Sequence, residues 1–319
     1  MKITESLLIR NYLKTLTFKN KNSLNLEDDI FYDSKSKIIF STDTYEENVH
    51  FLNSNNPKKF VKKIFRSTIS DILCKGAQPK VYFLSLSLNK ANKKWLKVFS
   101  NELKVESKKF GLYLGGGDTI KSKKLSITIS VLAYTTKTPV LRSKAKSNDD
   151  IYVTGNLGES YIGLLVNQKK KNLGKLNNHF KKIYENPNLP YKFSKYLHKF
   201  ATSSIDISDG ILKDLTSICK ASKCAANLDF LTLPMSNNTR KLTFKKKINF
   251  FNIFSKGDDF QILFSSNKKY RKIISKLAKK TSTKVTRVGK ILPGNFVKLS
   301  NSDKNISFTG KKIGYIHSF

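Results

Sequence analysis

The sequence predicts a mixed α/β (α+β) fold divided into two domains. Three observations carry this prediction. At 319 residues the chain is longer than one hydrophobic core usually serves. Segments that alternate as strands do are interspersed with segments whose apolar residues recur every three or four positions, as in amphipathic helices. Several short strand-like segments follow one another near the C-terminus, which is typical of α+β arrangements.

The first half of the chain contains the clearest periodic patterns. We expect helices over 4–14, 57–75 and 90–110, a strand over 37–44 that runs into a loop, and strands over 80–88 and 125–134. The second helix has the strongest signal. Its apolar residues, among them Ile64, Phe65 and Ile69, recur at three- and four-residue steps, and Pro57 stands near its start.

The domain boundary is expected near Pro139. Residues 135–142 carry no periodicity, which predicts one domain over 1–137 and a second over 138–319. In the second domain we expect strands over 149–155, 284–291, 296–299 and 305–308, and helices over 156–166, 210–221 and 268–280. The Lys- and Asn-rich segment 167–189 is interpreted as a surface excursion.

The charge of the chain is strongly positive and is carried mainly by lysine. The sequence holds 54 lysines and six arginines against 23 Asp and Glu residues, for a formal net charge of +37. Plentiful Asn, Ile, Phe and Tyr alongside sparse Ala, Gly and Pro indicate a genome biased towards AT-rich codons. A nucleic-acid-binding protein would use more arginine for bidentate contacts. We therefore expect nucleic acid to bind at most nonspecifically, with a polyanionic partner as the alternative.

The sequence contains no predicted membrane or secretory segment. No apolar run approaches the roughly 20 residues of a membrane span. Glu5 and Arg10 interrupt the apolar positions of the N-terminus, unlike in a signal peptide. Cys74, Cys219 and Cys224 are scattered and fit no zinc-binding spacing. We therefore expect a protein of the reducing cytoplasm.

The scarce acids concentrate beside apolar residues, mostly where strands end or helices begin. The segments are LEDDIF (26–31), STDT (41–44), SDIL (70–73), GGGDT (115–119), IDISDG (205–210) and KGDDF (256–260). Asp71 of SDIL is the exception, because it lies in the middle of the helix expected over 57–75. Singly, each has a plain structural explanation, such as a helix cap or a polar turn. Together they predict one cleft, because clustered carboxylates repel one another unless cations lie between them. Several Mg²⁺ ions bridging nucleotide phosphates would supply those cations.

In their order along the chain, these motifs resemble those of the thiamine-monophosphate kinases. The matching segments are FSTDTYEENVHF (40–51), SDILCKGAQPK (70–80), GGDT (116–119), LRSKAKSNDDIYVTGNLG (141–158), SSIDISDGILKDL (203–215) and KGDDFQILF (256–264). Further matches reach GYIHSF at 314–319, so the resemblance covers nearly the whole chain. It implies the two-domain fold of aminoimidazole ribonucleotide synthetase and selenophosphate synthetase. It also implies a homodimer paired through the N-terminal domains, with ATP in a cleft that the C-terminal domain completes.

The resemblance further implies a reaction, in which ATP donates its γ-phosphoryl group to thiamine monophosphate to give thiamine diphosphate and ADP. A phosphate oxygen needs little deprotonation before it attacks. We therefore expect direct in-line transfer assisted by several Mg²⁺ ions, without a strong general base and without a phosphoenzyme.

Position by position, the resemblance implies three groups of site residues. The implied metal ligands are Asp29, Ser41, Thr42, Asp43, Asp71, Asp118, Asp206 and Asp209. The implied ATP contacts are Gly117, Asp118, Arg142 and Ser208. The implied contacts to the thiamine substrate are His50, Asp258 and Tyr315.

Two motifs depart from the family pattern. Glu27 precedes the paired aspartates where the family usually has Gly, and Lys256 and Asp258 turn the family's GGED into KGDD. Both changes keep the acids, so we expect an active enzyme; a degenerate homologue that uses the cleft as a scaffold is the alternative. A selenophosphate synthetase would be expected to carry a reactive Cys in a glycine-rich N-terminal loop. Cys74 lies instead in the predicted helix around Asp71.

Overall fold

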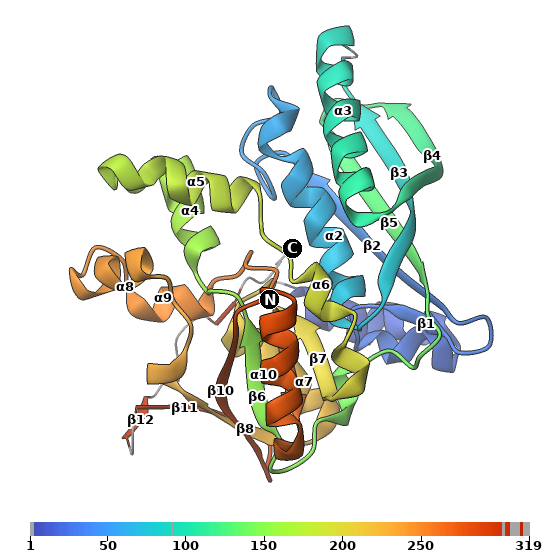
Figure 1. Cartoon of the computed structure of the whole chain (residues 1–319). Helices are drawn as coiled ribbons and strands as arrows, with labels where there is room; N and C mark the ends of the chain where they lie inside the picture. The colour runs from blue at the N-terminus through green and yellow to red at the C-terminus, as the bar shows by residue number, and fades with distance from the viewer. Residues whose placement is uncertain (1–2, 91, 302–303, 307–312, 315–319) are drawn as a thin grey trace.

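The chain folds around two β-sheets, seen in a computed structural model that describes residues 3–90, 92–301, 304–306 and 313–314 (Figure 1). Within these residues the first sheet has the strand order β1-β2-β5-β3-β4 and the second has the order β12-β11-β8-β10-β6-β9-β7. The strands of the first sheet are β1 (Phe31–Asp33), β2 (Ile38–Glu46), β3 (Gln78–Leu88), β4 (Tyr113–Lys121) and β5 (Ser126–Tyr134). Those of the second are β6 (Asp150–Thr154), β7 (Ala201–Asp206), β8 (Ala225–Asp229), β9 (Ile262–Ser266), β10 (Val285–Leu292), β11 (Val297–Asn301) and β12 (Lys304–Ile306). This architecture confirms the mixed α/β prediction.

Helices cover and connect the two sheets. In chain order the described α-helices are α1 (Glu5–Leu8), α2 (Val61–Cys74), α3 (Lys93–Phe110), α4 (Glu159–Asn167), α5 (Asn177–Glu185), α6 (Tyr191–Ser194), α7 (Ile211–Ser222), α8 (Asn237–Phe244), α9 (Phe250–Ser255) and α10 (Arg271–Lys280). Helix α2 has a central place, because it contacts β2, β3 and β5 of the first sheet and also β7 of the second (Figure 1). No helix in the described ranges is long and apolar enough to cross a membrane.

Most of the predicted elements are confirmed, and three differ. The helix expected over 4–14 is α1 followed by a π-helical stretch, Ile9–Leu13. The expected surface excursion 167–189 contains α5, whose buried Phe180 and Tyr184 were hidden among lysines in the sequence. The GGGDT segment, expected where a strand ends or a helix begins, lies inside β4, which pairs in parallel with β3.

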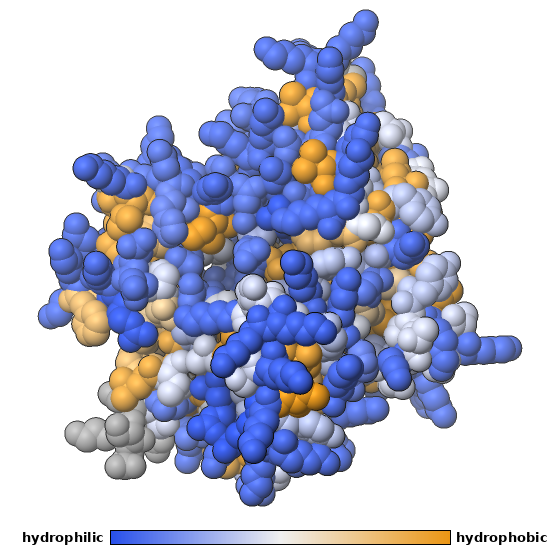
Figure 2. Space-filling model, viewed as in Figure 1, coloured by the Kyte–Doolittle hydropathy of each residue, from blue (hydrophilic) through white to orange (hydrophobic). Residues whose placement is uncertain are grey.

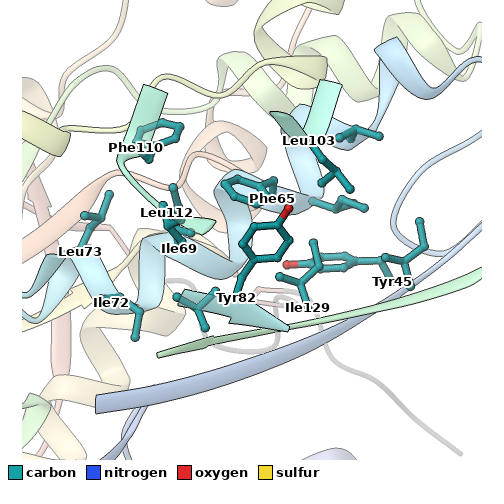
Figure 3. Close-up of a cluster of buried hydrophobic side chains, with 14 of the residues drawn as sticks. Tyr45, Phe65, Ile69, Ile72, Leu73, Tyr82, Leu103, Phe110, Leu112 and Ile129 are labelled. Atoms are coloured by element: carbon teal, nitrogen blue, oxygen red, sulfur yellow. The ribbon is translucent and has the colours of Figure 1, made fainter. Parts of the chain in front are cut away.

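Helix α2 forms because one face of it is continuously apolar. Ile64, Phe65, Ile69 and Ile72 are completely buried against the first sheet, where Figure 3 shows several of them among Tyr82, Leu112 and Ile129. Full burial of such side chains stabilises a fold by about 1.5–3 kcal/mol each. The helix is therefore fixed rigidly to the sheet, and side chains on its other faces have defined positions.

A stripe of buried polar side chains runs along another face of α2. Lys63, Arg66 and Ser70 follow each other at three- and four-residue steps, and all are buried. Most charged side chains lie instead on the surface, and Figure 2 shows hydrophilic residues over most of one face of the molecule. Buried polar groups need internal partners, so this stripe must bind other parts of the chain.

The Arg66–Glu106 ion pair satisfies one part of this stripe. Arg66 makes two bonds, of 2.7 and 2.8 Å, to the carboxylate of Glu106 in α3, and Nη1 donates to the Pro187 carbonyl at 2.9 Å. Both charged side chains are nearly inaccessible, at 8% and 1% exposure. The guanidinium thus joins α2 to α3 and to the segment before α6.

Replacing Glu106 should destabilise the fold. Glu106→Ala leaves a buried guanidinium without its counterion, for which we expect a loss of about 3–5 kcal/mol in the free energy of unfolding, measured by urea denaturation. The Lys62–Glu102 pair joins the same two helices closer to solvent, with 3.4 Å between its charged atoms. Glu102→Ala is therefore the matched control, with an expected loss of about 0–1 kcal/mol. Equal losses in the two variants would contradict a buried anchor at Arg66.

Candidate active site

Carboxylates from four separate segments meet beside α2. Asp43 comes from β2, Asp71 from α2 and Asp206 from the last position of β7, and Asp29 precedes β1. The Asp71 carboxyl interacts electrostatically with each of the other three. One ligand atom each of Asp29, Cys74 and Asp206 lie within 4.8 Å of one another. The structure thus brings together four of the acids that were predicted to bind metal.

This acid cluster, Asp29, Asp43, Asp71 and Asp206, favours the uptake of cations. Burial, followed by repulsion from the other three carboxylates, raises the pKa of Asp71 well above its usual value. Burial and then Asp29 raise the pKa of Asp206 to about 7, and burial raises the pKa of Asp43. Crowded carboxylates of this kind take up protons or bind a cation between them. Because Mg²⁺ prefers carboxylate oxygens, the donor set fits this ion.

Hydroxyl groups orient the acids of the cluster. Ser41 Oγ donates to Asp71 at 2.6 Å, Ser70 Oγ donates to Asp206 at 2.6 Å, and the Tyr45 hydroxyl donates to Asp43 at 3.0 Å. The predicted residue Ser41 therefore lies in the cluster as a partner of a carboxylate.

The Thr42 side chain lies outside this arrangement. Successive residues of a strand point to opposite faces of the sheet, so Thr42 faces away from its neighbours Ser41 and Asp43. It is exposed, and its hydroxyl bonds Ser130 Oγ on β5 at 2.8 Å.

Two cations hold Asp29 and its neighbour Asp28. Arg142 pairs with Asp29, and its backbone N–H donates to Asp28 at 2.9 Å. Lys75 Nζ lies 2.7 Å from Asp28 and 2.5 Å from Asp29. Although burial would raise the pKa of Asp29, Arg142 and Lys75 lower it to about 2. Arg142 was predicted; Lys75 was not, because in a chain with 54 lysines its only signal was a place at the end of an apolar helix.

The IDISDG loop follows Asp206 and separates its second acid from the cluster. Ser208 is exposed, with its hydroxyl 3.5 Å from Asp206 Oδ1. Asp209 pairs with Lys213 in α7 at 2.6 Å. Asp214, which sequence reasoning missed, is buried and accepts the Gly210 N–H at 3.0 Å. The helix N-terminus is therefore capped by Asp214, and Asp209 lies at the solvent side of the loop.

The KGDD loop is bound to the IDISDG loop through backbone atoms. The Asp258 N–H donates to the Ser208 carbonyl at 2.8 Å, and the Phe260 N–H donates to the Ile207 carbonyl at 2.8 Å. Next to these bonds the two loops approach so closely that a Cβ on Gly257 would lie 1.6 Å from the Ser208 oxygen. The second acid of the loop, Asp259, is buried with both of its oxygens 2.9 Å from the Gly158 N–H, at the start of α4.

Lys63 joins the two predicted substrate residues His50 and Asp258. Its buried ammonium lies 2.9 Å from the Asp258 carboxylate and 3.1 Å from the His50 carbonyl, with the ring of Tyr184 at 3.8 Å. The His50 ring accepts the Glu46 N–H at Nδ1. Lys63 was missed in the sequence, although its spacing from Arg66 and Ser70 is the signal of the buried polar stripe.

The glycine-rich segment lies apart from the acid cluster within one chain. Gly117 approaches its neighbour strand so closely that a Cβ would lie 1.9 Å from the Leu84 oxygen. Asp118 lies on the exposed edge strand β4, across β3 and β5 from β2. Asp118 is therefore three strand spacings away from β2, the strand of Asp43. At about 4.8 Å for each spacing, this distance is roughly 14 Å. Tyr315 lies outside the described residues.

Comparisons with known proteins identify the family of the chain. Residues 26–135 match the model of the AIR synthase related protein, N-terminal domain. The chain is 36% identical to a thiamine-monophosphate kinase of Buchnera aphidicola subsp. Schizaphis graminum over 99% of both chains. The chain belongs to the thiamine-monophosphate kinase family. A second family member, from Escherichia coli K12, is 30% identical over 82% of this chain and 81% of its own length.

Solved structures of the thiamine-monophosphate kinase family share the fold. AaThiL complexed with AMPPCP and TMP superimposes with a TM-score of 0.85 at 25% identity, covering 98% of this chain and 97% of that chain. The enzyme from Aquifex aeolicus gives a TM-score of 0.80 at 25% identity, covering 94% and 97% of the two chains. A hydrogenase maturation protein HypE in complex with ATP has the same fold at a TM-score of 0.67 and 14% identity, covering 96% and 94%.

Substituting Gly257 should detach the two loops from each other in this family member. In Gly257→Ala the new Cβ meets the Ser208 carbonyl, so we expect the amides of Asp258 and Phe260 to lose protection from hydrogen exchange. Lys256→Ala, one residue earlier in the loop, is the control and should leave both amides protected. Unchanged protection in Gly257→Ala would mean that the loops are not held together at this contact.

Proposed function

We propose that this chain transfers the γ-phosphoryl group of ATP to thiamine monophosphate, forming thiamine diphosphate and ADP. Membership of the family supports the reaction, and the bound molecules named for AaThiL support the two substrates. The observation that carries the proposal is the acid cluster, because phosphoryl transfer depends on cations held between carboxylates and phosphates. The three free cysteines are buried, which accords with activity in the cytoplasm.

The residues of the acid cluster have distinct proposed tasks. Asp43, Asp71 and Asp206 would hold Mg²⁺, with their carboxylates oriented by hydroxyl groups. Bound Mg²⁺ would supply neutralisation of the phosphate charges. Asp209 would join the ligands by exchanging its contact with Lys213. Preorganised carboxylates of this kind position the reacting groups without rearrangement during the reaction.

Transfer itself needs little from a general base. A phosphate oxygen of thiamine monophosphate forms the new bond to the γ-phosphorus while the bond from that phosphorus to the β,γ-bridging oxygen breaks, and ADP leaves with the electron pair. We propose that Arg142 and Ser208 contact ATP, since Ser208 is exposed beside Asp206 and Arg142 pairs with Asp29 of the cluster. The main task of the protein is to hold the two anions, ATP and thiamine monophosphate, in line for transfer.

The thiamine end of the substrate is assigned to the region of His50 and Asp258. The two belong to different halves of the chain and share one partner, Lys63. Because Asp258 is one methylene shorter than the Glu of the family motif and is paired with Lys63, we propose that it contacts the substrate through water.

We further propose a homodimer formed through the first sheet. Strand β4 is exposed along its whole length, including Tyr113 and Leu114 at 56% and 53% exposure. An exposed, partly apolar edge strand is a typical site of pairing with another chain. In a dimer, Gly117 and Asp118 could contact ATP bound to the other subunit. Within one chain they cannot reach the acid cluster, because roughly 14 Å separate β4 from the strand of Asp43.

The main test is a direct assay. Purified protein incubated with ATP, Mg²⁺ and thiamine monophosphate should form thiamine diphosphate, detected by chromatography, and free thiamine in a parallel reaction should remain unphosphorylated. Asp71→Asn should lower the rate about 100-fold or more, because a metal-binding charge is lost. Its metal-free form should melt no lower than wild type, because the lost charge was repelled by its neighbours.

Asp229→Asn is the matched control for Asp71→Asn. Asp229 caps a helical turn through Leu231 N–H in the second sheet, and Asn caps equally well. The Asp229→Asn variant should form thiamine diphosphate at the wild-type rate. A folded wild type that binds ATP but makes no thiamine diphosphate would favour the degenerate homologue.

The dimer is tested by light scattering. We expect twice the 36.3 kDa mass of the chain, and Leu114→Lys should give monomers because it charges the paired edge. Val105→Lys, on α3 with the same 53% exposure, should remain a dimer. A monomeric wild type that is fully active would overturn the proposed assembly and leave the reaction unaffected.

A further inference from the structure

Lys75 is a fully buried ammonium at the edge of the acid cluster. It directly follows α2, and its side chain has 0% exposure. Its Nζ lies 2.7 Å from Asp28 Oδ1, 2.5 Å from Asp29 Oδ2 and 3.0 Å from the Ser204 carbonyl. An ammonium has three N–H groups, so each of them has one acceptor. Lysines on the surface are hydrogen-bonded mainly to water. The Lys75 ammonium instead has a protein acceptor for each of its N–H groups.

The surroundings keep Lys75 charged. Burying an ammonium costs several kcal/mol unless opposite charges compensate for it. Here the compensation comes from two carboxylates within 2.7 Å of the ammonium, those of Asp28 and Asp29, and from the Ser204 carbonyl.

This positive charge lies against both carboxylates of the Asp28–Asp29 pair. Arg142 pairs with Asp29 through Oδ1, and Lys75 lies against Oδ2. Asp28 likewise accepts from Lys75 through Oδ1 and from the Arg142 N–H through Oδ2. Both carboxylates thus have cationic or N–H partners on each oxygen. Among the described residues, the hydrogen bonds given above to Asp43, Asp71 and Asp206 come from hydroxyl groups, although Arg142 and Lys75 also attract the Asp206 carboxylate electrostatically.

We propose that the Lys75 ammonium serves as a fixed cation at Asp28 and Asp29 in place of a divalent ion. The cluster then takes up one divalent ion fewer than it would without this lysine. Divalent ions then bind between Asp43, Asp71 and Asp206. The inference rests on the metal site of the proposed function. It adds that a lysine of the chain supplies part of the positive charge that balances the carboxylates.

The Lys75 ammonium has a structural role as well. The same ammonium bonds the Ser204 carbonyl of β7, two residues before Asp206. It therefore fixes the segment before β1 against the second sheet whether or not metal is bound. A divalent ion at the same place would make this contact depend on metal.

Lys75→Met tests the proposal, because methionine has a similar length and no charge. Binding of Mn²⁺ to substrate-free protein is counted by electron paramagnetic resonance of the free ion. Lys75→Met should bind one more Mn²⁺ than wild type. Its melting temperature without metal should be lower than that of wild type and should rise more on addition of Mg²⁺. Lys75→Arg keeps the charge and should retain the wild-type count.

Lys104→Met is the matched control, since Lys104 is exposed on α3 and its loss changes the net charge equally. It should bind as many Mn²⁺ ions as wild type. Equal counts in Lys75→Met and wild type would overturn the proposal, and so would a Lys75→Met protein that stays unfolded at every Mg²⁺ concentration. Absence of Mn²⁺ binding in all variants would overturn the metal site itself. Neither readout uses turnover, so failure of the kinase assay is a separate result.

Discussion

The crowding of buried negative charge beside α2 is the constraint on which the rest of the structure depends. Asp43, Asp71 and Asp206 lie in an environment where burial and mutual repulsion raise their pKa values. No single sheet supplies these acids, because Asp43 comes from the first and Asp206 from the second. The apolar face of α2 holds Asp71 in place against that repulsion. The packing of α2 thus supplies the free energy that keeps these repelling carboxylates together, as is typical of functional sites.

The positive charges around the cluster explain how the two sheets stay joined. Arg66, Lys63 and Lys75 are buried on or next to α2, and each binds acceptors from distant segments. Lys63 reaches the KGDD loop, Lys75 reaches β7 and Arg66 reaches the segment before α6. The backbone bonds between the KGDD and IDISDG loops add a contact that needs no charge. Three buried cations thus connect α2 and its C-terminal end to separate, distant segments of the chain.

The sequence allowed the acids to be predicted better than their partners. Periodicity identified α2 and most strands, and the motifs identified the cluster, because Asp is scarce and conspicuous in this chain. Lys75 and Lys63 were missed since a buried lysine looks like any other among 54. Strand β4 was missed because its glycines also suit a turn, and pairing with β3 decided the outcome. That Asp118 lies apart from Asp43 follows from strand order, which the sequence pattern does not contain.

The long-range contacts of α2 have a consequence for synthesis of the protein on the ribosome. Ser70 and Asp206 are 136 residues apart in the chain, and Lys63 and Asp258 are 195 apart. At about 5–20 residues per second, the partners of α2 are translated on the order of ten seconds or more after the helix. Arg66 can pair early, because Glu106 is only 40 residues further along the chain, whereas Lys63 and Ser70 must wait for the second half of the chain. The polar stripe is therefore completed in two stages of synthesis, first within the first half of the chain and then between the two halves.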